Sequence, residues 1–324
     1  MQPSRRKFLH LAAATAALPA LPCPALAQAW PTRPIRWIVP YPAGGATDLI
    51  SRVMAQWLTE RLGQSVIVDN RPGGGTNIGT QAVVSAPADG YTLLFTASTH
   101  TINVSLQQLP FNFLRDITLV SGLAELPLVL DVGVKVPAKN LAEFVAYAKA
   151  NPGKVNIASF GSATISHLAI ELFKIRTGAD VVHVPYRGGA QMMTDLISGQ
   201  IQAAVDSLPS SLPHIRSGAI RGLALLSAER TSVLPDLPVA KESIPDFEVR
   251  TFSGVGVPSG TPPEIVARLN REINAGLADP KIRARYADVG GSPVIVSTAE
   301  ANAFVKAQTA LWAKVIKSAG IKAE

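Results

Sequence analysis

The sequence of 324 residues contains one cysteine, Cys23, which excludes an intramolecular disulfide and any paired-cysteine metal or redox site. It also lacks the G-x-S-x-G turn of many serine hydrolases and the H-E-x-x-H motif of zinc peptidases. Its glycine-rich segments include no P-loop and no complete G-x-G-x-x-G fingerprint. We therefore expect a protein that is not an enzyme and that binds no cofactor and no metal ion.

Long apolar runs and clusters of one charge are scarce as well. After residue 27, no unbroken apolar stretch approaches the roughly 20 residues that a membrane-spanning helix needs. The net charge of +7 includes Arg5, Arg6 and Lys7, and no run of Lys or Arg is interleaved with aromatic residues. The composition therefore argues against a nucleic-acid partner.

The first 27 residues have the three parts of an export signal. Arg5-Arg6-Lys7 precedes Phe8-Leu9, an apolar run follows over 11–21, and Ala25-Leu26-Ala27 offers small residues for cleavage. Paired arginines in this position are typical of a twin-arginine signal. We predict cleavage after Ala27, which removes the cysteine, and release of the protein into the periplasm.

The rest of the chain alternates short strand-like runs, beginning with Ile35 to Val39, with amphipathic helical patterns, one of which follows Asn140 as its expected cap. This alternation is typical of a parallel, doubly wound α/β sheet. After Thr261 the pattern becomes mostly helical, with Thr261 as the expected cap of a helix over 264–277. A helical tail must cover a sheet face, so we expect it to return to the first lobe. The predicted division is a signal peptide at 1–27, lobe 1 at 28–127 plus 252–324, and lobe 2 at 128–251.

A strand that ends in Val-Pro-Tyr before a glycine pair and a helix occurs twice, over 39–45 and over 184–189. Backbone N–H groups at the start of a helix are unpaired and carry the positive end of the helix dipole, so each loop can hold a carboxylate. A tight strand-to-helix connection without a ligand is the alternative for each copy. The candidate ligand residues in the two copies are Tyr41, Ala43, Gly44, Gly45, Tyr186 and Arg187.

Three further loops follow strands, and ligands of open α/β sheets bind outside the carboxyl ends of the strands. They cover 71–79, 98–100 and 159–167. The alternative for the first is a flexible glycine loop without a ligand, and the alternative role for Thr164 in the third is to cap a helix. A metal at His167 and Glu171 would need further ligands. The three loops contribute the candidates Thr76, Ser98, His100, Gly161, Thr164 and His167.

Two aspartates complete the candidate set. Asp48 lies just inside the first helix, where it either supports the glycine loop or meets a ligand ammonium group. Asp206 ends a strand of the second lobe and is a similar candidate.

Several segments of the chain carry motifs that occur together. They are Tyr41-Pro42-Ala43-Gly44-Gly45 with Asp48 and Arg52, Asn70 to Gly75, Ala88-Asp89-Gly90-Tyr91, His167-Leu168 with Glu171-Leu172, Val184-Pro185-Tyr186 with Gly188, and Pro258 to Pro262. Together these motifs resemble the Bug family, the substrate-binding components of tripartite tricarboxylate transporters, over nearly all of the chain after the signal. One departure is Ala163, where the family often has glycine, and this difference is expected to narrow that wall and alter ligand choice.

The resemblance implies a two-lobed periplasmic-binding-protein fold with a hinged cleft that closes on a small carboxylated solute. This solute would be an organic acid, a dicarboxylate, an acidic amino acid or an aromatic carboxylate. In such proteins the first glycine loop, here Tyr41 to Gly45, holds a ligand carboxylate through backbone and water-mediated hydrogen bonds, and hydroxyls near Thr164 contribute from the second lobe. Its partners would be the two membrane subunits of a transporter or a sensor protein, and we expect a monomer. The alternative function is a periplasmic hydrolase that uses serine, histidine and aspartate residues of the cleft.

Overall fold

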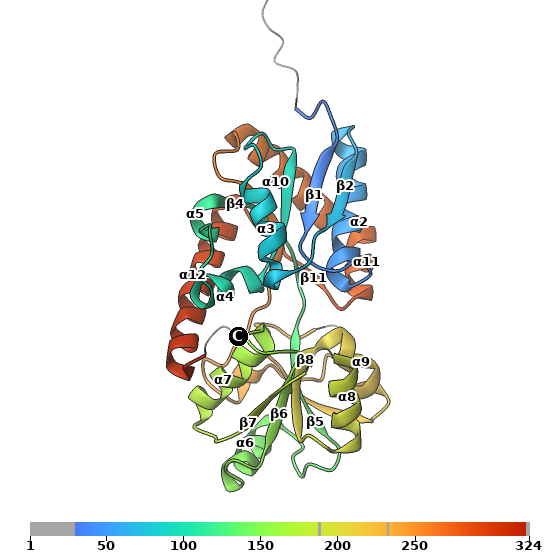
Figure 1. The fold of residues 1–324 in the computed structure, drawn as a ribbon. Coiled ribbons are helices and arrows are strands. Elements are labelled where there is room, and N and C mark those ends of the chain that lie inside the picture. Colours follow the sequence, from blue (N-terminus) through green and yellow to red (C-terminus); the bar gives the residue numbers. More distant parts are fainter. Residues whose placement is uncertain (1–29, 187–188, 232, 322–324) are drawn as a thin grey trace, which may run out of the picture.

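The computed structural model describes residues 30–186, 189–231 and 233–321, which form two α/β lobes. Figure 1 shows the first sheet with its helices above the second. The α/β architecture predicted from the alternating pattern is confirmed. The predicted signal peptide at 1–27 and the candidate Arg187 lie outside the described residues.

The first lobe is built on a six-stranded sheet in the order β11-β4-β10-β3-β1-β2. β1 is parallel to both β2 and β3, but β10 is antiparallel to β3 and β4. The prediction of a purely parallel sheet is wrong here, because β10 enters from the second lobe and runs opposite to β3. The strands are β1 (Ile35–Val39), β2 (Val66–Asn70), β3 (Thr92–Ala97), β4 (Ile117–Glu125), β10 (Ser253–Pro258) and β11 (Ser292–Pro293).

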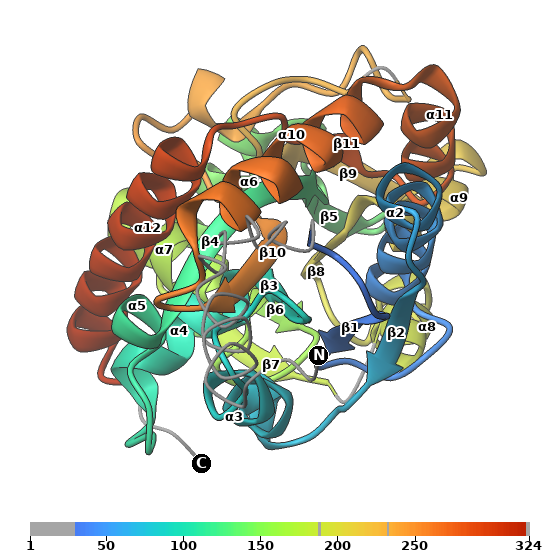
Figure 2. The same ribbon diagram turned by 90° about the horizontal axis from the view of Figure 1, so that it is seen from above.

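Helices cover both faces of this sheet, as the view from above shows (Figure 2). Side chains alternate along a strand, so β1 sends Trp37 to one face and Ile38 to the other. The Trp37 face packs against α2, α10 and α11, and the Ile38 face against α3, α5 and α12. The helices of this lobe are α2 (Ala46–Leu62), η1 (Gly74–Thr76), α3 (Asn77–Val84), α4 (Ser98–Leu106), α5 (Phe113–Asp116), α10 (Pro263–Ala278), α11 (Pro280–Asp288) and α12 (Thr298–Ala319).

The second lobe contains a five-stranded sheet in the order β7-β6-β8-β5-β9. β6, β7 and β8 are parallel, whereas β5 arrives from the first lobe and is antiparallel to β8 and β9. α6 and α7 cover one face, and α8 and α9 the other. The elements are β5 (Leu128–Gly133), α6 (Leu141–Ala150), β6 (Asn156–Ser159), α7 (Ile165–Thr177), β7 (Val182–Pro185), α8 (Gly189–Ser198), β8 (Ala203–Ser207), α9 (Leu208–Arg216), β9 (Ile220–Leu225) and η2 (Ala240–Glu242).

Two chain crossings join the lobes and lie side by side. The first leads from β4 into β5 through Leu126, and the second leads through Thr251 into β10. The Leu126 N–H donates to Thr251 Oγ1 over 2.9 Å, and that hydroxyl donates to Leu126 O over 2.6 Å. The two crossings are therefore tied to each other at the boundary between the lobes.

The C-terminal helix makes a third connection. The 22 residues of α12 run down the side of the molecule in Figure 1, from the first sheet to α7 of the second lobe. Trp312, Val315 and Ile316 join the core of the second lobe. α10, α11 and the start of α12 pack on the first sheet, as expected of the helical tail, and the apolar face of α12 then extends beyond that sheet.

The local signals at helix starts have mixed outcomes. Asn140 caps α6, since its side chain accepts from the Glu143 N–H as the pattern predicted. The predicted Thr261 cap of α10 is wrong. Pro262 occupies the cap position, and the Thr261 hydroxyl instead closes the turn after β10 by donating to Pro258 O over 2.7 Å.

Candidate functional site

A pocket of about 210 Å³ lies between the two lobes, and we call it the cleft pocket. Strand ends and helix starts of both lobes form its walls, and the two crossings form its base. Most of the lining side chains are apolar or aromatic. The lining residues are Tyr41, Thr47, Phe95, Ala97, Ser98, Thr99, Ala124, Leu126, Leu128, Phe160, Ile165, Ser207, Thr251, Phe252 and Ser253.

The first glycine loop leads into α2 beside this pocket. Gly44 has φ +89°, a conformation that glycine adopts without steric cost, and Gly45 is the N-cap of α2 with φ −83° and no side-chain cap. A Cβ built on Gly44 meets no atom within 4 Å, and one on Gly45 reaches only Thr47 Oγ1 at 4.0 Å. The backbone of this loop is therefore open to close approach at the positive end of a 17-residue helix.

Asp48 holds this loop in place. Its side chain is 5% exposed and accepts from the Gly44 N–H (2.9 Å), Arg52 Nε (3.0 Å) and Asn70 Nδ2 (3.0 Å). Burial alone would raise the pKa of this carboxyl, but the bonds from Arg52, Gly44 and Asn70 together hold it below its ordinary value. Of the two roles left open for Asp48, the geometry favours support of the loop.

Tyr41 and Ser98 bring polar groups to the first-lobe wall. The Tyr41 hydroxyl donates to Thr99 Oγ1 over 3.2 Å, its ring meets Phe95 edge to face, and burial raises its pKa to about 12. Ser98 Oγ accepts from the Phe252 N–H over 3.0 Å, and the Ser98 N–H donates to Phe252 O. Ser98 therefore joins the start of α4 to the second crossing.

The loop between β6 and α7 forms the facing wall through Phe160 and Ile165. Thr164 caps α7 by accepting from the His167 N–H, and its hydroxyl donates to Gly161 O over 2.7 Å. Gly161 has φ +137° and Ala163 has φ +59°, so Ala163 is held in a conformation that favours glycine. Thr164 and Gly161 shape this wall but do not line the pocket themselves.

Two stacked histidines hold the loop between β6 and α7 through hydrogen bonds. The ring centroids of His167 and His183 are 3.8 Å apart with an interplanar angle of 9°. The Ala163 N–H donates to His167 Nδ1 over 3.0 Å, and His183 Nε2 lies 2.6 Å from Ser159 Oγ. Burial, with the nearby His167 and Lys174, lowers the pKa of His183 to about 4.

The second Val-Pro-Tyr copy is built differently from the first. Thr-Asp-Leu-Ile occurs at 47–50 and again at 194–197, so Asp195 is the counterpart of Asp48. The Tyr186 hydroxyl donates to Asp195 Oδ2 over 2.7 Å, so this aspartate holds a tyrosine instead of a glycine loop. Asp206 is 2% exposed, lies beneath Gly189, and accepts from the N–H of Ser207, which lines the pocket. Tyr186 and Asp206 are therefore near the pocket but outside its lining.

The structure places two other candidates deeper in the first lobe. His100 is 3% exposed, with Nδ1 accepting from the Ala97 N–H over 3.0 Å and Nε2 lying 3.0 Å from Thr80 Oγ1. Burial lowers its pKa to about 4. Thr76 is 4% exposed, and its backbone oxygen accepts a hydrogen bond from the Thr80 hydroxyl. Neither lines the cleft pocket.

Sequence reasoning missed most of the apolar wall. Phe95, Phe160 and Phe252 line the pocket, yet none was a candidate. Phe95 lies two residues before the end of β3, and Phe252 lies directly before the start of β10. Their positions beside the predicted cleft were the signal by which the sequence could have identified them. Within the described part of the chain, no group of three or more His, Cys, Asp or Glu side chains could hold a metal ion, and no helix is long and apolar enough to cross a bilayer.

Residues 50–321 match a family described as the tripartite tricarboxylate transporter family receptor, TctC. Protein BugT of Bordetella pertussis (strain Tohama I) is 38% identical over 303 residues, which cover 92% of this chain and 93% of BugT. Among solved structures, R. palustris Rpa4515 with adipate is 35% identical with a TM-score of 0.77, covering 90% of this chain and 99% of that one. MatC from Rhodopseudomonas palustris with bound malate is 28% identical with a TM-score of 0.73, covering 89% and 100%.

Proposed function

Because the chain belongs to the tripartite tricarboxylate transporter family of periplasmic receptors, we propose that it binds a small carboxylated solute in the cleft pocket and presents it for uptake or sensing. The observation that carries this proposal is a pocket lined by residues of both lobes and of both crossings. A solute that touches both lobes favours the arrangement in which they are closed. We propose that the two lobes, 28–127 plus 252–324 and 128–251, move relative to each other on binding, with the end of α12 packed on the second lobe.

The carboxylate is assigned to the first glycine loop, over 43–45. Among the described residues, no Lys or Arg lines the cleft pocket, so recognition of the charge falls to backbone N–H groups and hydroxyls at the start of α2. Thr164, Tyr186, Arg187 and Asp206 remain proposed contacts of the second lobe after closure.

The rest of the ligand is proposed to be an aliphatic or aromatic body. Tyr41, Phe95, Phe160, Ile165 and Phe252 offer apolar surface, against which a hydroxylated acid would lose hydrogen bonds to water. The relatives named with adipate and malate support carboxylates as the class, and the apolar walls favour acids such as adipate over malate.

We further propose that the protein is exported by a twin-arginine signal that is cleaved after Ala27. We also propose that it is a monomer and that its partners are two membrane subunits or a sensor protein. A hydrolase remains the alternative. A serine–histidine hydrogen bond occurs between Ser159 and His183, but Ser159 is fully buried, so a substrate has no access to it. Turnover of a generic ester by the purified protein would favour the hydrolase.

A thermal-shift screen of carboxylates tests the proposal after the protein has been unfolded and refolded to remove any bound solute. A ligand at about 100 times its Kd stabilises the native state by about 2.7 kcal/mol, which raises Tm by a few degrees. Gly45→Val should abolish the shift while the apo protein stays folded, since φ at Gly45 suits valine. Ala284→Val, at an exposed position of α11, is the matched control and should keep the shift. Normal binding by Gly45→Val would remove the loop from the site.

A further inference from the structure

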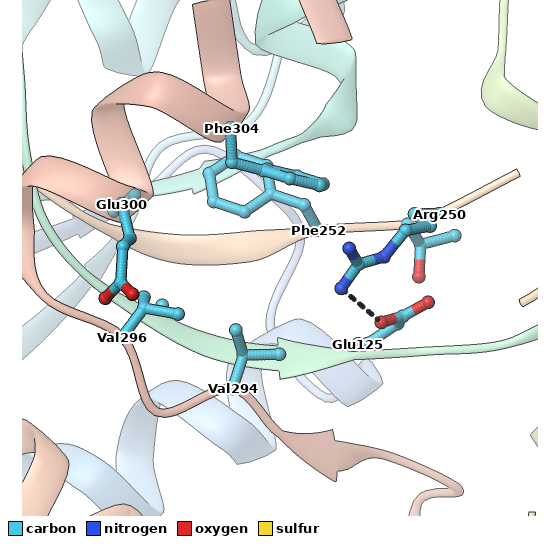
Figure 3. Close-up of a pocket in the computed structure, with 10 residues that line it drawn as sticks. Glu125, Arg250, Phe252, Val294, Val296, Glu300 and Phe304 are labelled. Carbon is cyan, nitrogen blue, oxygen red and sulfur yellow. Dashed lines mark ion pairs between the residues drawn. The ribbon is translucent and has the colours of Figure 1, made fainter. Parts of the chain in front are cut away.

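A second pocket, of about 220 Å³, lies between the crossings and α12, and we call it the hinge pocket. Figure 3 shows Phe252 and Phe304 on one side, Val294 and Val296 on the other, and Glu300 at the end away from Arg250. It shares only Thr251 and Phe252 with the lining of the cleft pocket. The segment that lines the cleft therefore also separates the two pockets.

One end of the hinge pocket carries an ion pair whose hydrogen bonds are incomplete. Glu125 ends β4 and Arg250 precedes β10, so each comes from one of the two crossings. Arg250 Nη2 lies 3.6 Å from Glu125 Oε2, too far for a hydrogen bond. Arg250 Nε and Glu125 Oε1 are buried and have no hydrogen-bond partner in the described structure.

The two unpartnered atoms indicate which hydrogen-bonding groups a bound molecule would need. Arg250 Nε needs an acceptor, and Glu125 Oε1 needs a donor or a proton. A buried polar atom without a partner is unfavourable, so a molecule that bonds to both is favoured there. The guanidinium carbon of Arg250 is 5.0 Å from the centre of the Phe304 ring, which positions the charge beside the apolar part of the pocket.

We propose that the hinge pocket is a second binding site, distinct from the cleft, for a short-chain monocarboxylate. Arg250 binds the carboxylate, and the chain lies between Phe252 and Phe304 on one side and Val294 and Val296 on the other. This proposal does not depend on the function assigned to the cleft.

Binding at this site takes up a proton. Glu125 and the incoming carboxylate compete for one guanidinium, so one of the two acids must be neutral when both are buried. Burial raises the pKa of Glu125; Arg250 opposes this, and Glu248 and Glu229 add to it. Arg230 is a further charged group on this side, since it lines the adjoining pocket with Glu125 and Arg250. Glu300 faces the far end of the pocket, where its carboxylate caps α12 with Ser297. The proton is thus expected on Glu125, which then donates to the ligand.

Titration calorimetry with hexanoate tests the site in the purified protein. Ala301→Leu fills the pocket from α12 and should weaken hexanoate at least tenfold, while Ala299→Leu adds the same group at an exposed position of the same helix and should not. Arg250→Gln removes the charge without filling the pocket and should also weaken binding at least tenfold. Gly45→Val removes any binding of hexanoate to the cleft and should leave one hexanoate site, the hinge pocket, with an affinity within about twofold of that site in the wild type. No hexanoate binding to the wild type, or binding lost in Gly45→Val and kept in Ala301→Leu, would overturn the proposal.

The length of the ligand's hydrocarbon chain and the proton taken up on binding give two further measurements. Both are made in Gly45→Val so that the cleft does not contribute. Each methylene removed from hexanoate should weaken binding about fourfold, equivalent to about 0.8 kcal/mol per buried CH₂. Adipate should bind more weakly than hexanoate, since its second carboxylate would meet the apolar walls and Glu300. Titrations in two buffers of different protonation enthalpy should show net proton uptake on hexanoate binding at pH 7.5, and none once Glu125→Gln is added. Equal affinity for hexanoate and adipate, with no proton uptake, would refute this geometry.

Discussion

Replacing Asp48 by asparagine tests how the first glycine loop is held. Asp48 Oδ2 accepts from the Gly44 N–H and Arg52 Nε, while Oδ1 accepts from Asn70 Nδ2. An asparagine offers one oxygen, so its NH₂ group must face a donor whichever way it is oriented. Asn70 cannot turn to compensate without cost, because its Nδ2 also donates to Tyr41 O and its Oδ1 accepts from Arg52.

The expected loss for Asp48→Asn is about 1–3 kcal/mol of unfolding free energy at pH 7, the usual cost of a buried polar group left facing the wrong partner. The same substitution at Asp195, the equivalent residue of the repeated segment, is the matched control. Asp195 accepts one bond from the Tyr186 hydroxyl, which an asparagine oxygen can also accept, so its loss should stay below about 1 kcal/mol.

Urea unfolding at pH 7 measures both variants, and carboxylate titration of each shows whether the loop still binds. The pKa of Asp48 is lowered by folding, so its contribution is fully present above the ordinary value of 3.8 and is lost only as the pH falls through the lower folded value. The gap between wild type and Asp48→Asn should therefore be constant from pH 7 to about pH 5. Equal losses at Asp48 and Asp195, or unchanged carboxylate affinity in a folded Asp48→Asn protein, would refute the role assigned to Asp48.

Three other outcomes are expected. Ala163→Gly should stabilise the protein by up to about 1 kcal/mol in urea unfolding, because Ala163 has φ +59°; a loss of stability would show that the wall tolerates alanine without strain. Folding lowers the pKa of His100 from 6.5 to about 4, so stability present above pH 6.5 should fall by about 3 kcal/mol as the pH drops towards 4. The stability of His100→Gln should fall less over this pH range, and identical stability profiles of the variant and the wild type would contradict the prediction. Small-angle scattering should show a smaller radius of gyration with the cleft ligand bound; a clear melting shift without compaction would mean a preformed pocket.

Much of the fold follows from local pattern, because alternation along a strand and helical periodicity are properties of neighbouring residues. The run Ile35 to Val39 predicted β1, and Asn140 predicted the start of α6. The direction of β10 could not be predicted in this way, since it depends on which lobe the chain comes from. The reach of α12 depends likewise on Trp312 finding a core in the second lobe.

The sequence could predict which loops form the candidate site, but it could not predict which side chains contact one another within them. The two Val-Pro-Tyr copies share Thr-Asp-Leu-Ile, and nothing in that shared segment distinguishes Asp48 from Asp195. What separates them lies elsewhere in the chain: Asn70, at the end of β2, brings an amide to Asp48. Asp195 meets instead the tyrosine of its own copy. The same motif thus holds an open glycine loop in one lobe and an aromatic ring in the other, and this asymmetry supports the proposal that a carboxylate binds at the first loop.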